Sequence, residues 1–206
     1  MFIKICGLTN LEDAKKAVEL GADAIGFIFA RSPRRAEPQK VKSIIRELKG
    51  DVLKIGVFVN EDAEKIKSIV KDCGLDAVQF HGDESPEFCS GFTGLKLIKA
   101  IRVKNIESLN IISDFKNIFA CLLDTFSNDK YGGTGKTFNW DLAVKAKKYK
   151  KPLILSGGLN IDNIEEAITF VRPYGVDISS SIESGPGKKD IDKMSKIIGL
   201  IKALDL

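Results

Sequence analysis

The chain has 206 residues, a length that suits one domain with a sizeable core, and we expect residues 1–206 to form a single domain. Its 32 basic and 28 acidic residues give a formal net charge of +4, which mildly suits anionic substrates. No basic run with interleaved aromatic residues indicates nucleic-acid binding, and no apolar run approaches the length of a membrane span. The N-terminus has no signal-peptide pattern, so we expect a cytoplasmic protein.

The four cysteines, Cys6, Cys73, Cys89 and Cys121, form no C-x-x-C pair, and the chain contains one histidine. This composition argues against a zinc site, and we expect no metal. Free thiols are typical of the reducing cytoplasm.

Short apolar, β-branched runs alternate with amphipathic helical patterns from one end of the chain to the other. In chain order, eight runs are predicted as strands: Phe2–Cys6, Ala24–Phe29, Leu53–Val59, Ala77–Phe80, Leu95–Ile101, Phe119–Asp124, Leu153–Ser156 and Val176–Ser179. The eight helices predicted to follow them are Leu11–Leu20, Pro38–Leu48, Ala63–Cys73, Pro86–Gly91, Ile106–Asp114, Trp140–Tyr149, Ile161–Val171 and Ile191–Leu204.

Local signals mark where these helices begin and end. Asn10, Asn60, Asn160 and Asp190 are expected to cap helix starts, because their side chains can accept from free backbone N–H groups. A repeated glycine at 21, 74 and 175 is expected to end helices in the left-handed conformation. Eight uninterrupted strand–helix units predict an α/β protein, a single (β/α)8 TIM barrel rather than an open doubly wound sheet.

In such a barrel the carboxyl ends of the strands carry function. Lys4 and Cys6 share one face of the first strand, and Ile3 and Ile5 share the other, so we expect the lysine and the thiol to point into the barrel. A nearby ammonium group is expected to lower the pKa of the Cys6 thiol, which makes the thiol a candidate base. The alternative is a small buried apolar cysteine.

Asp124 closes the apolar run of the sixth strand. Burial favours the protonated form of a carboxyl group, so Asp124 is a candidate general acid. The alternative is an aspartate that caps a helix or a turn. The glycine-rich segment 131–136 follows it, and its spacing excludes a P-loop.

Two further strand ends suit an anion. Ser156-Gly157-Gly158 and Ser179-Ser180-Ser181 end the seventh and eighth strands, where phosphate sites of this fold often lie. Arg34 belongs to a group of three arginines after the second strand, and arginine binds carboxylates in a bidentate manner, although most surface arginines are only solvated. His81 is at the end of the fourth strand, where a lone histidine is more often structural than catalytic.

The chain resembles the phosphoribosylanthranilate isomerase family over essentially its whole length. The motifs that carry the resemblance, besides Asp124 and Glu183, are KICGLTN at 4–10, GFIF at 26–29, SPR at 32–34, GVFVN at 56–60, VQFHG at 78–82, YGGTGKTF at 131–138, LSGGL at 155–159, DISS at 177–180 and PGKKD at 186–190. The combination of the first motif with LSGGL is specific to this family.

The resemblance implies a cofactor-independent Amadori rearrangement in tryptophan biosynthesis, the third step from chorismate. N-(5-phosphoribosyl)anthranilate becomes 1-(2-carboxyphenylamino)-1-deoxy-D-ribulose 5-phosphate. By resemblance, Asp124 is the acid that protonates the ribose ring oxygen, and Cys6 is the base that takes the C2′ proton. Arg34 is implied to hold the anthranilate carboxylate.

The same resemblance assigns the phosphate to backbone groups of Gly157, Gly158, Ser180 and Ser181, and we place His81 among the substrate-binding residues. The expected partner is therefore a small phosphorylated molecule, without nucleic acid or membrane, in a monomer or a homodimer. Two positions depart from the family pattern. Ser181 replaces a glycine, which matters if that position needs a positive φ, and Phe80 replaces a common leucine.

Three other interpretations remain open. An aminoimidazole ribonucleotide isomerase would usually have aspartate in place of Cys6. A pentulose-phosphate epimerase would need metal-binding histidines, which a single histidine cannot supply. A non-catalytic phosphate-binding barrel would bind ligand without turnover.

Overall fold

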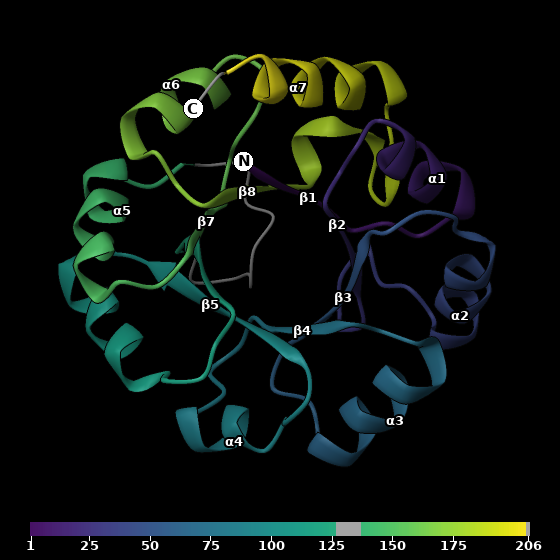
Figure 1. The fold of residues 1–206 in the computed structure, drawn as a ribbon, viewed down its shortest axis with the longest axis horizontal. Helices are drawn as coiled ribbons and strands as arrows, with labels where there is room; N and C mark the ends of the chain where they lie inside the picture. Colours follow the sequence, from purple (N-terminus) through teal and green to yellow (C-terminus); the bar gives the residue numbers. More distant parts are fainter. Residues whose placement is uncertain (127–136, 205–206) are drawn as a thin grey trace.

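The computed structural model describes residues 1–126 and 137–204, and in it eight parallel strands close into a barrel in the order β1 to β8. The strands are β1 (Phe2–Cys6), β2 (Ala24–Ile28), β3 (Leu53–Phe58), β4 (Ala77–Phe80), β5 (Lys96–Val103), β6 (Ala120–Thr125), β7 (Leu153–Leu155) and β8 (Gly175–Ile178). Figure 1 shows this ring of strands at the centre with the helices arranged around it. The predicted (β/α)8 barrel is confirmed.

The helices lie outside the barrel and connect successive strands. They are α1 (Leu11–Glu19), α2 (Pro38–Glu47), α3 (Ala63–Cys73), α4 (Pro86–Ser90), α5 (Trp140–Ala146), α6 (Ile164–Val171) and α7 (Ile191–Ala203), with 3-10 helices η1 (Ile106–Asp114), η2 (Lys147–Tyr149) and η3 (Ser180–Ile182). No helix within residues 1–126 and 137–204 combines the length and apolar character needed to cross a bilayer.

Three predicted helices differ from the structure. The predicted helix 106–114 is a 3-10 helix, the predicted helix 140–149 divides into α5 and η2, and the seventh helix begins at Ile164 rather than Ile161. The sequence pattern also missed η3 and the short antiparallel hairpin of β9 (Glu183–Gly185) and β10 (Lys188–Lys189) between β8 and α7. The residues of these two strands are Glu-Ser-Gly and Lys-Lys, which lack the apolar run by which the other strands were predicted.

Two of the four predicted N-terminal caps are correct. The side chains of Asn10 and Asp190 accept from backbone N–H groups three residues on, at 2.9 and 3.1 Å. Asp62 caps α3 in place of Asn60, and α6 begins at Ile164, so its cap position is Asn163 rather than Asn160.

Asn60 instead adopts a left-handed conformation with φ of 49°, and its side-chain oxygen accepts from the backbone N–H of Asp83. Among the helix ends, Gly74 is the predicted left-handed cap, and Gly21 also has a positive φ. Gly175 lies within β8, and Arg172 adopts the left-handed conformation that ends α6.

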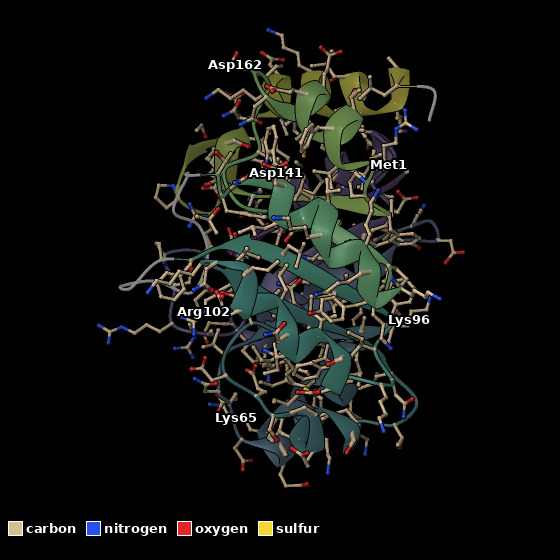
Figure 2. All side chains as sticks on the ribbon, turned by 90° about the vertical axis from the view of Figure 1, so that its left-hand side faces the viewer. Met1, Lys65, Lys96, Arg102, Asp141 and Asp162 are labelled. Carbon is tan, nitrogen blue, oxygen red and sulfur yellow. The ribbon has the colours of Figure 1, made fainter. Side chains whose placement is uncertain are left out.

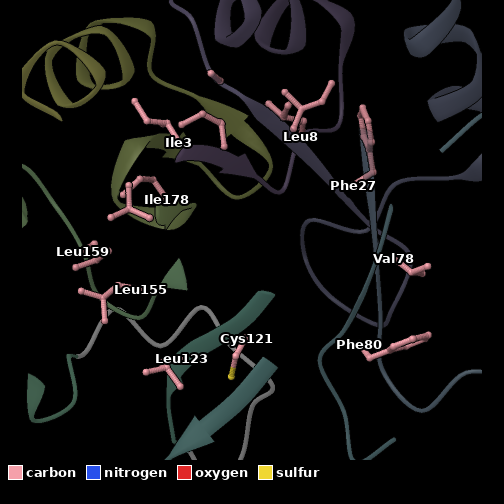
Figure 3. Close-up of a cluster of buried hydrophobic side chains, with 14 of the residues drawn as sticks. Ile3, Leu8, Phe27, Val78, Phe80, Cys121, Leu123, Leu155, Leu159 and Ile178 are labelled. Carbon is pink, nitrogen blue, oxygen red and sulfur yellow. The ribbon is translucent and has the colours of Figure 1, made fainter. Parts of the chain in front are cut away.

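The strands bury side chains on both faces. Side chains of the outer face form one buried cluster with apolar residues of the helices, and Figure 3 shows Val78, Phe80, Leu123 and Leu155 of this cluster. The inner face is apolar toward the amino ends of the strands, where a buried cluster is formed by Ala24, Ile55, Ala77, Ile98, Ala100, Ala120, Leu122 and Ile154.

Toward the carboxyl ends the inner positions become polar. Buried residues there include Lys4, Gln79, Asp124, Ser156 and Asp177. Buried polar groups are costly unless they are paired, so a cluster of them at one end of a barrel indicates a functional site. Figure 2 shows the barrel from the side, with Arg102, Lys65 and Asp162 toward this end and Met1 and Lys96 toward the opposite end.

Candidate active site

The thiol of Cys6 lies beside an internal ion pair. Lys4 and Cys6 both point into the barrel, as predicted from strand alternation, and both are buried. The ammonium nitrogen of Lys4 lies 2.9 Å from Oδ2 of Asp177, its register partner on β8. Both side chains of this ion pair are buried inside the barrel.

Burial raises the pKa of the Cys6 thiol above its ordinary value, although the charges of Lys4 and Lys189 act in the opposite direction. Lys4 does lower the pKa of the Cys6 thiol, as expected, but the net pKa is raised, because desolvation of a thiolate inside the barrel outweighs the nearby ammonium groups. Burial also disfavours the charged form of Lys4, but Asp177 and Cys6 raise the pKa of Lys4 overall. Lys4 therefore keeps its positive charge beside the thiol of Cys6.

The β9–β10 hairpin holds the end of β1. The buried ammonium group of Lys189 donates to the backbone oxygens of Cys6 at 2.7 Å and Ser179 at 3.0 Å. The same group lies 3.1 Å from a carboxylate oxygen of Glu183. Burial lowers the pKa of Lys189, while Glu183 opposes the shift. These contacts fix the backbone that carries the thiol.

Arg34 is held by the same hairpin. Its Nε donates to both carboxylate oxygens of Glu183, at 2.9 and 3.0 Å. Gly7 has a positive φ of 77°, and a Cβ there would lie 2.9 Å from Cδ of Arg34, so glycine leaves room for the arginine. The terminal guanidinium nitrogens of Arg34 make no hydrogen bond within the described residues, and they are suited to a carboxylate.

Each carboxyl oxygen of Asp124 has a hydrogen-bond partner. The backbone N–H of Thr125 donates to Oδ1 at 2.8 Å, and Nε2 of His81 lies 3.1 Å from Oδ2. The other ring nitrogen of His81, Nδ1, lies 2.8 Å from the amide nitrogen of Gln79. Asp124 is part of β6 and caps none of the helices described within residues 1–126 and 137–204. His81 contacts the candidate acid rather than standing alone.

A cavity of about 440 Å³ lies beyond the ends of β7 and β8. Its lining residues are Gly158, Asn160, Ile161, Asp162, Ser180, Ser181, Ile182, Lys193 and Ile197. Ser180 and Ser181 begin η3, and the first N–H groups of a helix have no acceptor within it, so they favour an anion. Three of the four residues predicted to bind phosphate line this cavity.

Gly157 is the exception, because it lies against the candidate acid. It has a φ of 84°, and a Cβ there would lie 2.8 Å from Oδ1 of Asp124.

The hydroxyl oxygen of Ser181 is buried in the cavity wall with no hydrogen-bond partner among the described residues. No group of three or more His, Cys, Asp or Glu side chains in residues 1–126 and 137–204 is placed to hold a metal ion.

Residues 3–199 match the family model described as N-(5'phosphoribosyl)anthranilate (PRA) isomerase. The chain belongs to this family. It is 49% identical over 201 residues to the N-(5'-phosphoribosyl)anthranilate isomerase of Pelobacter propionicus, a match that covers 97% of this chain and 95% of the relative. It is 48% identical to that of Desulforudis audaxviator, with 97% of each chain covered.

The fold agrees with solved structures of this family. The chain is similar to the crystal structure of phosphoribosyl anthranilate isomerase from Thermotoga maritima, with a TM-score of 0.92 and 41% identity over 99% of this chain and all of that chain. A second crystal structure of a phosphoribosyl anthranilate isomerase, in complex with reduced 1-(o-carboxyphenylamino)-1-deoxyribulose 5-phosphate, gives a TM-score of 0.89 and 40% identity.

The two departures from the phosphoribosylanthranilate isomerase pattern have simple structural accounts. Ser181 lies outside the left-handed region, since the non-glycine residues with positive φ are Asn60, Lys150 and Arg172 among those described. A glycine is therefore not needed at 181 for its backbone conformation. Phe80 packs in an aromatic cluster with Phe88 and Phe92 on the outer face, so its replacement of leucine is a change of packing. The glycine-rich segment 131–136 lies outside the described residues.

Sequence reasoning did not assign a role to Gln79, Asp177, Glu183 or Lys189. Each becomes part of the site through a contact with a residue on another element or loop. For Glu183 and Lys189 the family motifs drew attention to the positions, but no local pattern reveals which arginine or carbonyl group they would contact.

Proposed function

We propose that this chain converts N-(5-phosphoribosyl)anthranilate to 1-(2-carboxyphenylamino)-1-deoxy-D-ribulose 5-phosphate, with Asp124 as the acid and Cys6 as the base. Family membership over residues 3–199 supports the reaction. The observation that supports the residue roles is the placement of a buried thiol and a buried carboxyl group at the carboxyl ends of β1 and β6, inside one rim of the barrel.

The acid acts first. Asp124 donates its proton to the ribose ring oxygen, the C1′–O bond breaks, and the nitrogen lone pair forms a protonated Schiff base. Asp124 is thereby left as a carboxylate, which accepts from the N–H of Thr125 and faces His81. Donors aimed at a charge that develops during the reaction stabilise the transition state more than the starting state. They therefore lower the barrier.

The base acts second. The thiolate of Cys6 removes the C2′ proton, the electron pair moves toward the iminium nitrogen, and the resulting enolamine tautomerises to the ketone. Burial disfavours this thiolate in the free protein. The positive charge of the iminium beside it favours the thiolate, because an opposite charge stabilises the ionised form. The positive charge of Lys4, on the same strand, also favours the thiolate of Cys6.

Two anionic groups orient the substrate. The phosphate is bound in the cavity lined by Gly158, Ser180 and Ser181, and the carboxylate of the anthranilate ring is held by the free end of Arg34. Holding both ends of one substrate places the sugar between acid and base. The related enzyme structure with a reduced phosphorylated product analogue supports a phosphorylated ligand for this site.

We also propose that residues 1–206 act as a single domain, and that the protein works in a reducing cytoplasm. The four cysteines are free and buried, which is consistent with a reducing compartment.

The decisive experiment follows the fluorescence change of freshly prepared phosphoribosylanthranilate with the purified protein. The natural sequence is expected to turn over, and Cys6→Ala and Asp124→Asn are each expected to lose about a thousandfold or more in kcat. Cys73→Ala is the matched control, because Cys73 is also a buried thiol but lies on α3 and donates to the backbone oxygen of Pro38. Near-normal rates in either site variant would refute the role of that residue.

A further inference from the structure

We propose that Gln79 is a positioning residue for the acid, because its amide fixes the tautomer of His81 and so keeps a ring N–H aimed at Asp124. The inference rests on the proposed acid role of Asp124. It adds a third member to the pair formed by His81 and Asp124, and it concerns a residue that contacts no reacting atom.

Strand alternation brings Gln79 and His81 to the inner side of the barrel. Val78 and Phe80 belong to the core cluster under the helices, and Figure 3 shows both on the outer side of β4. Ala77 belongs to the inner cluster, and Gln79 and His81 follow at intervals of two. Both polar side chains are buried, with 1% and 8% of their surface exposed. Their hydrogen bonds are therefore formed with the protein rather than with bulk water.

The chemistry of the amide decides the tautomer. The amide nitrogen of Gln79 is a donor only, and it lies 2.8 Å from Nδ1 of His81. Nδ1 must then accept, so in the neutral ring the proton is on Nε2. Nε2 lies 3.1 Å from Oδ2 of Asp124, where it donates. The series of hydrogen bonds therefore runs, from donor to acceptor, from Gln79 through His81 to Asp124.

This direction suits the charge that the reaction creates. When Asp124 gives up its proton, each of its oxygens faces one N–H donor, from Thr125 on Oδ1 and from His81 on Oδ2. With the proton on Nδ1 instead, the lone pair of Nε2 would face the new carboxylate and repel it. A preorganised donor at a developing charge lowers the barrier to the first step.

The fold alone does not account for a glutamine at this position. Oε1 of Gln79 is buried and has no hydrogen-bond partner among the described residues. An unpaired buried carbonyl destabilises the folded state, so an apolar side chain of similar length would suit the interior at least as well. A polar residue kept at a cost in stability is expected where it serves function.

The chain offers a direct spectroscopic test, because His81 is its only histidine. Nitrogen-15 NMR of histidine-labelled protein, recorded at a pH where the ring is neutral, is expected to show a protonated Nε2 and an unprotonated Nδ1. A ring protonated on Nδ1 alone would overturn the proposal, without any variant. In Gln79→Glu a carboxylate replaces the amide donor, and Nδ1 is expected to become protonated.

Kinetics supply the second readout. Gln79→Met and Gln79→Glu are each expected to lose about tenfold or more in kcat with KM changed by less than about twofold, because the substrate is bound by other groups. Gln79→Met is also expected to melt no lower than the natural protein. Gln39→Glu is the matched control, since Gln39 is the other glutamine and is exposed on α2. This control is expected to leave tautomer, kcat and melting temperature unchanged.

Two results would contradict the positioning role. The first is a kcat of Gln79→Met equal to that of the natural protein. The second is a loss of kcat that is fully explained by a lower melting temperature of the variant. The tautomer measurement is independent of turnover, so a failure of the isomerase assignment is distinguishable: the natural protein would then be inactive while its His81 spectrum still reported the direction of the hydrogen bonds.

Discussion

Cys6 on β1 and Gly26 on β2 are register partners, and a Cβ built on Gly26 would lie 2.7 Å from the sulfur of Cys6. No such contact is tolerated between real atoms, so the missing side chain of Gly26 is what leaves room for the thiol. The same Cβ would lie 3.2 Å from Cε of Lys4. One glycine thus creates the space that the thiol and the ammonium group share.

Gly26→Ala is therefore expected to displace the thiol and to lower kcat by about tenfold or more while the barrel still folds. Overpacking of this kind costs about 1–3 kcal/mol of stability. The assay and a thermal melt measure the two effects. Gly199→Ala is the control, because Gly199 is exposed on α7 with no atom close to a new Cβ. Full activity in Gly26→Ala would mean that the thiol position is not critical.

Arg34→Lys is expected to raise KM by about tenfold with little change in kcat. Lysine keeps the charge but lacks the planar fork that contacts Glu183 on one side and can bind a carboxylate on the other. Steady-state kinetics separate the two constants. The neighbouring Arg35→Lys serves as the control, since the side chain of Arg35 is half exposed and contacts Glu37. Equal effects at both positions would contradict a role of Arg34 in binding the substrate.

Ser181→Ala is expected to weaken inhibition by inorganic phosphate about fivefold. The hydroxyl group of Ser181 is buried in the cavity wall without a partner, and one hydrogen bond to an anion contributes about 1 kcal/mol or more. Competition by phosphate in the fluorescence assay measures the change. Ser184→Ala is the control, because Ser184 is exposed on β9 and lies outside the cavity lining. An unchanged inhibition constant would remove Ser181 from the phosphate site.

The protein is expected to lose stability as the pH rises above about 9. Burial raises the pKa of Cys121 from an ordinary 9.0 to about 12, so between these values the folded state binds a proton that the unfolded state has released. The free energy of unfolding therefore falls with pH, by about 1.4 kcal/mol per pH unit for one such group. Urea unfolding at several alkaline pH values measures the slope.

Cys121→Ala is expected to make this slope shallower, whatever its own cost in stability. Leu123→Ala is the comparison, because Leu123 is buried on the same outer face of β6 but does not titrate. If both variants kept the slope of the natural protein, the buried thiol would not be its source.

The course of the chain through the barrel could be read from local patterns. Each strand is a short apolar run, and side chains along a strand point alternately to its two faces, so the inward direction of Lys4 and Cys6 followed from the outward direction of Ile3 and Ile5. The carboxyl ends of parallel strands meet at one rim, which is why a thiol at 6 and a carboxyl group at 124 could be placed together before any coordinates.

The tertiary structure alone decided what those groups contact and how they ionise. Arg34 meets Glu183 across 149 residues of sequence, and Lys189 meets the carbonyl oxygen of Cys6 across 183. Neither pairing has a local signal. Lys4 lowers the pKa of Cys6, as its place on the strand predicted, but the net pKa is raised, because desolvation depends on everything that surrounds the thiol and the sequence displays only its neighbours along the strand. Local periodicity is a property of a segment, but burial and charge pairing are properties of the closed barrel.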